Sequence, residues 1–237
     1  MRESMIYCTL NLREISQDNT LKLRCAGSGV YDVFSGLGHL KNNPDAYMEK
    51  NGPIPPGKYW IVDRPTGGIG SILKQKEKEW RTGNNYDEWF ALFKNDSLIN
   101  DKTIVVFKSY IGVGQSDYLN DIRALLVHEP PEQDSVYKKL NTSVYQKRAL
   151  VKNASENFSG INERPFTYNL QERSSFRLHP LRPDGTGVSD GCITFYHRED
   201  FNKLRRDLLR ANKQKVPGSQ LEAYGIITVS DNRYDKY

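Results

Sequence analysis

Short stretches rich in Val, Ile, Tyr, Phe and Thr recur along the chain, with Gly, Pro, Asn or Asp between them. This pattern is typical of β-strands separated by turns. It predicts strands at Met5–Leu12, Leu21–Cys25, Val30–Ser35, Lys58–Asp63, Thr103–Lys108, Ser175–His179, Gly191–Phe195 and Ala223–Ser230. The proline-rich stretch 52–57 lacks backbone donors and predicts a rigid connection into the strand at Lys58. We therefore expect a mainly β protein.

A different periodicity appears near the C-terminus. Phe201, Leu204, Leu208 and adjoining Leu209 recur at helical spacing, after acidic residues that suit the first turn of a helix. Residues 109–171 also differ from the strand pattern, and we expect them to form a helical insertion within one domain spanning 1–237. The apolar positions of its two expected helices are Leu119, Ile122, Leu126 and Val127, and then Val136, Leu140 and Val144.

Charge and the lengths of the apolar runs argue against two kinds of partner, nucleic acid and a membrane span. The 34 Lys and Arg outnumber the 29 Asp and Glu, for a net charge of +5 without a basic run. We therefore expect no nucleic acid partner, whereas a mild positive charge suits an anionic polymer such as a cell wall. No apolar run approaches the roughly 20 residues that span a bilayer. The N-terminus lacks the pattern of a signal peptide, which predicts synthesis in the cytoplasm without one.

Three cysteines are too few for a disulfide framework or a zinc site, so we expect no metal. Cys8 and Cys25 lie in predicted strands, where we interpret them as small buried hydrophobic residues; a bridge between them is the alternative.

Candidate chemistry gathers around Cys192. His179 ends one predicted strand, a loop rich in Gly and Pro follows, and Cys192 comes directly after Gly191 at the start of the next strand. If the two strands are adjacent and antiparallel, the histidine and the cysteine face each other. A neighbouring imidazolium lowers a thiol pKa and favours the nucleophilic thiolate.

Neighbouring residues suit the same chemistry. Gly191 permits a tight turn that directs its own N–H and that of Cys192 at an oxyanion, and Ser189 and Asp190 can orient the imidazole or line the pocket. The spacing fits equally well a buried strand cysteine and a strand-end histidine without function.

A wider resemblance distinguishes these alternatives. His179-Pro180 followed by Ser189-Asp190-Gly191-Cys192-Ile193 resembles the signature of L,D-transpeptidases, and more closely that of the Tlde1 family of type VI secretion effectors that target peptidoglycan. Further segments resemble that family in order: Phe34–Gly38, Asn42–Pro44, Gly52–Tyr59, Asp63–Pro65, Trp89–Leu92, Phe176–Pro180 and Tyr224–Ile227. The chain departs from the family pattern in a longer loop after His179 and in the insertion 109–171.

The resemblance implies an L,D-transpeptidase-like β-sandwich or barrel and acyl transfer on peptidoglycan stem peptides. Cys192 is then the nucleophile and His179 the base. The products are those of L,D-carboxypeptidase trimming or of exchange with a D-amino acid, and no cofactor is needed. It also implies delivery by a type VI secretion component, action in the periplasm of target cells, and a cognate immunity protein.

Other residues and functions are secondary candidates. Arg177, Arg64 and His39 are candidates for binding the substrate's carboxylates, each with a structural or surface role as the alternative. Trp80 and Trp89 are expected in the core, although one of them can wall a substrate groove. Two rival functions remain: a cysteine amidase or endopeptidase of the papain kind, whose nucleophile normally precedes its histidine, and a non-catalytic wall-binding module.

Overall fold

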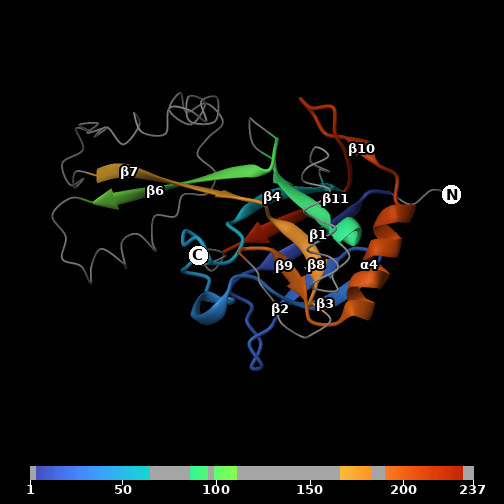
Figure 1. Ribbon diagram of the computed structural model, residues 1–237, viewed down its shortest axis with the longest axis horizontal. Helices are drawn as coiled ribbons and strands as arrows, with labels where there is room; N and C mark the ends of the chain where they lie inside the picture. The colour runs from blue at the N-terminus through green and yellow to red at the C-terminus, as the bar shows by residue number, and fades with distance from the viewer. Residues whose placement is uncertain (1–3, 65–85, 96–98, 111–165, 183–189, 232–237) are drawn as a thin grey trace, which may run out of the picture. The chain divides into compact units, whose positions relative to one another are not determined.

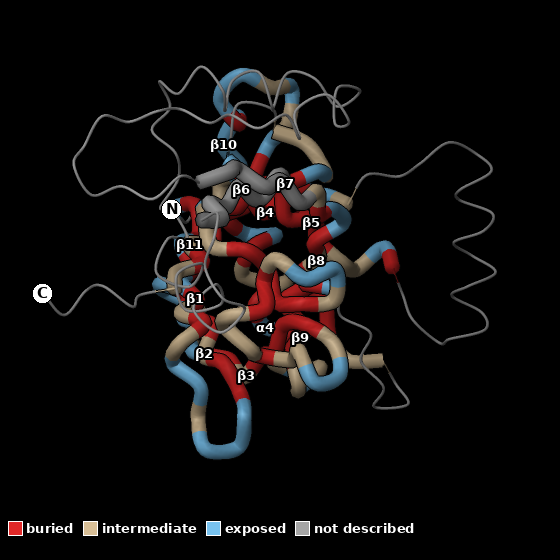
Figure 2. Tube along the Cα trace, turned by 90° about the vertical axis from the view of Figure 1, so that its left-hand side faces the viewer, coloured by how far each residue is buried: buried red, intermediate tan, exposed pale blue. Residues whose placement is uncertain are grey.

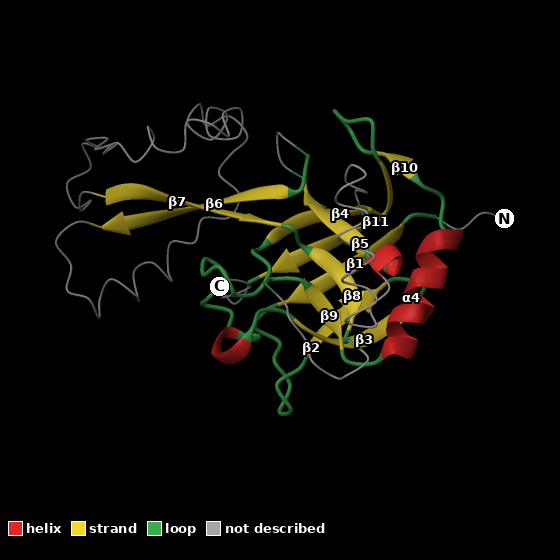
Figure 3. Cartoon of the chain, viewed as in Figure 1, coloured by secondary structure: helices red, strands yellow, loops and turns green. Residues whose placement is uncertain are grey.

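The computed structural model describes residues 4–64, 86–95, 99–110, 166–182 and 190–231. Strands dominate these residues (Figure 3). They are β1 Ile6–Asn11, β2 Leu21–Cys25, β3 Gly29–Phe34, β4 Gly57–Asp63, β5 Phe90–Lys94, β6 Lys102–Tyr110, β7 Phe166–Ser174, β8 Arg177–Pro180, β9 Ile193–Phe195, β10 Gln214–Lys215 and β11 Glu222–Ser230. The helical elements are the 3-10 turns η1 Gly38–Leu40 and η2 Tyr86–Glu88 and the helix α4 Arg198–Arg210.

Eight of the described strands close into a barrel (Figure 1). Their hydrogen-bonded order is β1-β2-β3-β9-β8-β5-β4-β11, and a pairing of β11 with β1 completes the circle, while β10 adds to β11 outside it. The β1–β11 and β8–β9 pairs are parallel, and the other pairs are antiparallel. The prediction of a mainly β fold is confirmed.

Alternation of burial along the strands explains the closure. In β1 and β2, every second residue is buried, as expected when one face of a strand packs inward. Buried positions concentrate on the barrel strands (Figure 2). In β5 all five residues are buried, so the strand shows no alternation and was missed in the sequence, as were β7 and β10.

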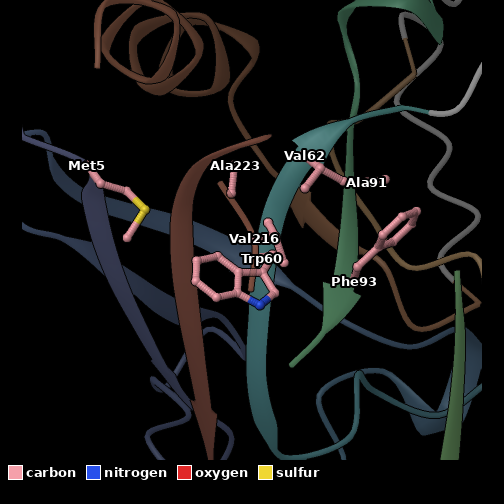
Figure 4. Packing of buried hydrophobic residues seen from close by; sticks show 7 residues of the cluster. All are labelled: Met5, Trp60, Val62, Ala91, Phe93, Val216 and Ala223. Atoms are coloured by element: carbon pink, nitrogen blue, oxygen red, sulfur yellow. The ribbon is translucent and has the colours of Figure 1, made fainter. Parts of the chain in front are cut away.

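Strands β4 and β5 are buried on both faces, and one of these faces contributes to an apolar cluster (Figure 4). Trp60 pairs with Phe93 and Val62 with Ala91 across these strands, so their side chains lie on one side of the sheet. On the other side of β4, Tyr59 and Ile61 are fully buried. The members of the cluster are Met5, Trp60, Val62, Ala91, Phe93, Val216 and Ala223.

The predicted C-terminal helix is confirmed as α4, which contacts β8, β9 and β11. It buries Phe201, Leu204 and Leu208, and the ring of Phe201 packs edge-on against Phe195 of β9 at 5.6 Å between centroids. Leu209, included with them in the sequence pattern, is exposed. The helix thus braces the strand that leads away from Cys192.

The interpretation of Cys8 and Cys25 as separate buried hydrophobic residues is wrong, because the two form a disulfide. Antiparallel pairing of β1 with β2 places them directly opposite each other, which brings the sulfur atoms within bonding reach. Both residues are buried, so the bridge lies within the barrel wall rather than on its surface.

The chain divides into two compact units. The first comprises Met1–Asn95, Ile99–Lys102 and Ser174–Tyr237, and the second comprises Asp96–Leu98 and Thr103–Arg173. In the second unit, β6 pairs with β7 as a two-stranded sheet. The described ends of segment 109–171 therefore lie in strands, and the two helices expected within it lie outside the described residues.

Candidate active site

Pairing of β8 with β9 brings the two residues of the proposed catalytic pair to adjacent strands. His179 lies opposite Thr194 in the register, and Cys192 comes two residues before Thr194. Side chains alternate along a strand, so if this alternation extends one residue beyond the start of β9, the cysteine lies on the same side as the histidine. The strands are parallel, so the expected antiparallel arrangement is wrong: the chain crosses over between them instead of turning back as a hairpin.

The His179 ring is held by three contacts. Nδ1 lies 2.8 Å from the carbonyl oxygen of Pro180, and Nε2 lies 3.3 Å from the Thr194 hydroxyl. A carbonyl oxygen only accepts, so Nδ1 carries the proton and the Nε2 lone pair accepts the hydroxyl hydrogen. Trp89 stacks on the imidazole with 4.1 Å between centroids and 15° between planes. The basic nitrogen therefore faces β9, the strand that follows Cys192.

Burial keeps this imidazole neutral. His179 is 3% exposed, and desolvation lowers its pKa to about 4. The hydrogen bond to Pro180 acts in the opposite direction, while the positive charges of Arg182 and Arg177 add to the lowering.

The Cys192 sulfur lies beside the chain that leads into β8. The residue is 8% exposed and is not in a disulfide, and its Sγ lies 3.7 Å from the carbonyl oxygen of Ser175. Ser175 is exposed and has a φ of +64°, a conformation that a non-glycine residue adopts only when its surroundings hold it there. The left-handed turn at Ser175 directs its carbonyl at the thiol.

Burial also keeps the thiol protonated. Desolvation raises the pKa of Cys192 to about 11, although the backbone N–H and the charge of Arg177 lower it; the carboxylates of Asp190 and Asp101 raise it further. The direction is opposite to the lowered thiol pKa expected from a neighbouring imidazolium, because a buried imidazole is itself uncharged. At neutral pH the pair is a thiol and a neutral imidazole.

Gly191 precedes the cysteine with a φ of +99°, which only glycine adopts without strain. The tight turn expected at this position is therefore present. Asp190 is exposed, at the outer side of this turn. Ser189 lies outside the described residues.

Comparison with known protein families adds an independent observation. A family model described as the Tlde1 domain matches residues 29–110 and 114–219. The chain belongs to the Tlde1 domain family. This is a family of type VI secretion effectors. No match was found among curated proteins or among solved structures.

Arg177 is the candidate for substrate binding in this Tlde1 domain whose backbone N–H and charge act on the Cys192 sulfur. Its guanidinium donates to both carboxylate oxygens of Asp101, at 2.5 and 2.6 Å, and to the carbonyl oxygen of Phe176 at 2.8 Å. A bidentate pair of this kind holds both partners in place. The backbone carbonyl oxygen of Asp101 accepts the backbone N–H of Ser175 at 3.0 Å, so this residue also anchors the chain segment beside Cys192.

Arg64 reaches the histidine indirectly. Its guanidinium lies over the Tyr86 ring at 5.1 Å and donates to the Tyr86 carbonyl oxygen at 3.3 Å. Tyr86 packs edge-on against Trp89 at 4.5 Å, and Trp89 covers His179. By contrast, His39 is exposed on η1.

The sequence did not identify several residues that surround the Tlde1 site. Trp89 was expected in the core, with a place in the wall of a substrate groove as the alternative, and it is half-buried over the histidine; Trp80 lies outside the described residues. The sequence did not predict a role at the site for Thr194, Ser175 or Asp101. Each reaches the site only because of the strand register or the loop in which it lies. Where the structure describes the chain, no cluster of three or more His, Cys, Asp or Glu is placed to bind a metal ion. In the same residues, no helix has the length and apolar content needed to cross a membrane.

Proposed function

We propose that this Tlde1 domain is an antibacterial cysteine enzyme that cleaves or exchanges the terminal D-alanine of peptidoglycan tetrapeptide stems, with Cys192 as nucleophile and His179 as base. The observation that carries the proposal is the pairing of His179 with Thr194 of β9, the strand that Cys192 directly precedes, with the imidazole lone pair facing that strand. This arrangement supports a proton transfer from sulfur to nitrogen.

The reaction follows from a neutral pair. As the sulfur attacks the carbonyl carbon of the third stem residue, the Thr194 hydroxyl turns away from Nε2 of His179, the thiol proton passes to that nitrogen, and an S–C bond forms. The oxyanion is received by the backbone N–H groups of Gly191 and Cys192. The C–N bond to D-alanine then breaks, and the imidazolium returns its proton to the leaving amine. Water, or the amine of a D-amino acid, attacks the thioester and restores the thiol.

Two groups offset the cost of charging this buried pair. The face of Trp89 lies on the imidazole, where its negative quadrupole favours the imidazolium that forms during attack. The backbone N–H of Arg177 favours negative charge on the sulfur. Charge separation is thus assisted at both ends without a resting ion pair.

Membership of the Tlde1 family supports a proposal for where the reaction takes place and how the protein is delivered there. Delivery through a type VI secretion component brings the domain into the periplasm of a target cell, where stems are accessible. A cognate immunity protein protects the producer and, as we propose, covers the Cys192 region.

The test is mass analysis of tetrapeptide muropeptides incubated with purified wild-type protein and with Cys192→Ala. We expect loss of one D-alanine with the wild type and none with the variant. Release of the stem from its glycan identifies an amidase instead. Unchanged muropeptides with the wild type, or equal products with both proteins, overturn the enzymatic proposal.

A further inference from the structure

Ser35 connects the end of β3 to the residue before the nucleophile. It is fully buried, with 0% exposure. Its hydroxyl oxygen accepts the backbone N–H of Ile54 at 2.8 Å and lies 3.3 Å from the carbonyl oxygen of Gly191. Because a carbonyl oxygen can only accept, the hydroxyl donates its single hydrogen to Gly191.

The bond to Gly191 sets the direction of another group. The carbonyl of Gly191 and the N–H of Cys192 belong to one peptide unit, which is planar and trans, so they point in opposite directions. A hydroxyl that holds the carbonyl on one side thus aims the Cys192 N–H at the other. This peptide unit is oriented by ψ of Gly191 and φ of Cys192, and because glycine has no Cβ, local sterics restrain the first of these angles only weakly.

The serine is itself held from behind. Its backbone N–H donates to the Asn42 side-chain oxygen at 2.9 Å, and the Asn42 side-chain nitrogen donates to the Asn19 carbonyl at 2.6 Å. These bonds place the Ser35 backbone without touching Gly191. The network therefore separates into one part that anchors the loop and one bond that restrains the peptide unit before Cys192.

We propose that Ser35 is a positioning residue that aims the Cys192 N–H at the oxyanion of the acyl-transfer intermediate. The inference rests on the proposed function, since it names the group that prepares the oxyanion site of the same reaction. An oxyanion donor acts only once negative charge develops on the substrate oxygen. Loss of Ser35 therefore slows acylation while leaving the intrinsic reactivity of the thiol unchanged.

The test compares Ser35→Ala with Asn42→Gly, a control that removes the anchoring bonds, keeps the bond to Gly191 and suits the φ of +57° at Asn42. Three quantities are measured: kcat and KM for release of D-alanine from a tetrapeptide muropeptide, the alkylation rate of Cys192 with iodoacetamide, and the melting temperature. For Ser35→Ala we expect kcat to fall about 10- to 100-fold, below the loss for a deleted oxyanion donor, with KM and alkylation within about twofold of wild type. Asn42→Gly should stay within about threefold of wild type in kcat.

The outcomes separate the inference from the function on which it rests. Equal kcat for Ser35→Ala and Asn42→Gly, or an alkylation rate that falls as far as kcat, overturns the positioning role while the enzyme stands. A wild-type protein that releases no D-alanine overturns both. If Ser35→Ala does not fold, Ser35→Cys replaces it, with nearly the same shape and a weak donor, and alkylation is then read on the Cys192 peptide by mass spectrometry.

Discussion

Two strand pairs of the barrel carry buried sulfur atoms, and their surroundings differ. On β1 and β2, Cys8 faces Cys25 across an antiparallel pair and the two are bonded. Cys192, just before β9, is also buried. Its neighbours are the carbonyl oxygen of Ser175 and the backbone N–H of Arg177, and the imidazole of His179 lies on the paired strand β8. The sulfur atoms of both sites are thus buried, and at Cys192 polar groups lie beside the sulfur.

The difference shows what separates a structural cysteine from a candidate nucleophile. The register of β1 and β2 places each of these two sulfur atoms opposite the other. The parallel register of β8 and β9 places a proton acceptor on the side of Cys192, and the turns at Gly191 and Ser175 bring backbone groups toward the sulfur. Each of the following predictions tests this distinction by changing one of the two sites or the groups around it.

The largest effect is expected at the nucleophile. Cys192→Ala should reduce release of D-alanine by more than about 1,000-fold, because no other described thiol lies beside the histidine. The melting temperature should change little, since one sulfur is lost without opening a bond. The double variant Cys8→Ala with Cys25→Ala is the matched control and should retain kcat below its own melting temperature. Comparable activity loss in both proteins would contradict the distinction.

The second prediction concerns pH. The alkylation rate of Cys192 with iodoacetamide should rise about tenfold for each pH unit from 7 to 10, because burial raises the thiol pKa to about 11 and only the thiolate reacts. Release of D-alanine should instead fall only as the pH drops through about 4, where His179, whose pKa burial lowers, takes up a proton. Circular dichroism at each pH checks that the fold persists. An alkylation rate that is already constant at pH 7 would indicate an ion pair.

The third prediction concerns the disulfide between Cys8 and Cys25. Loss of the Cys8–Cys25 bridge, whose cysteines are 17 residues apart, should lower the free energy of unfolding by about 2–4 kcal/mol, because the unfolded chain gains freedom when the loop opens. Urea unfolding of the wild type with and without reductant, and of the double alanine variant, measures it. A midpoint that reductant leaves unchanged would show that the bridge contributes nothing.

The smallest effect is expected at the aromatic cover of the histidine. Trp89→Leu keeps an apolar side chain over His179 but removes the ring face, and should reduce kcat by about 3- to 30-fold through weaker stabilisation of the imidazolium. Trp89→Phe should lose less. Trp60→Phe, in the apolar cluster of Figure 4, serves as control and should leave kcat unchanged. If Trp89→Leu matches this control in kcat and in its pH profile, the stacking has no part in the reaction.

Strand positions were largely predictable from local pattern. Segments with turn residues on both sides, such as Leu21–Cys25 and Lys58–Asp63, match β2 and β4 to within a residue. Phe90–Lys94 was not recognised, because a strand buried on both faces loses the alternation that marks a strand. The sequence predicted His179 and Cys192 as a catalytic pair from local features, namely their residue types and the glycine before the cysteine, and this assignment stays a prediction.

The partners across strands could not be predicted in the same way. A linker of the length of 181–192 permits a hairpin or a crossover, so the parallel pairing of β8 with β9 was not expected. Likewise, two predicted strands joined by a long loop do not reveal that Cys8 lies opposite Cys25. Ser35 and Trp89 belong with these cases, because each reaches the site from a segment far away in the sequence.

Residue chemistry and strand propensity are local properties, and the amino-acid order alone contained them: a β-rich chain, an amphipathic helix near its end, and the histidine and cysteine that we propose for acyl transfer. Register, protonation and disulfide pairing depend on what lies across a strand and how much water reaches it. These properties are set by the folded barrel. Burial there raises the thiol pKa of Cys192 and lowers the pKa of His179, and the packing of the chain brings Ser35 to the peptide unit before Cys192.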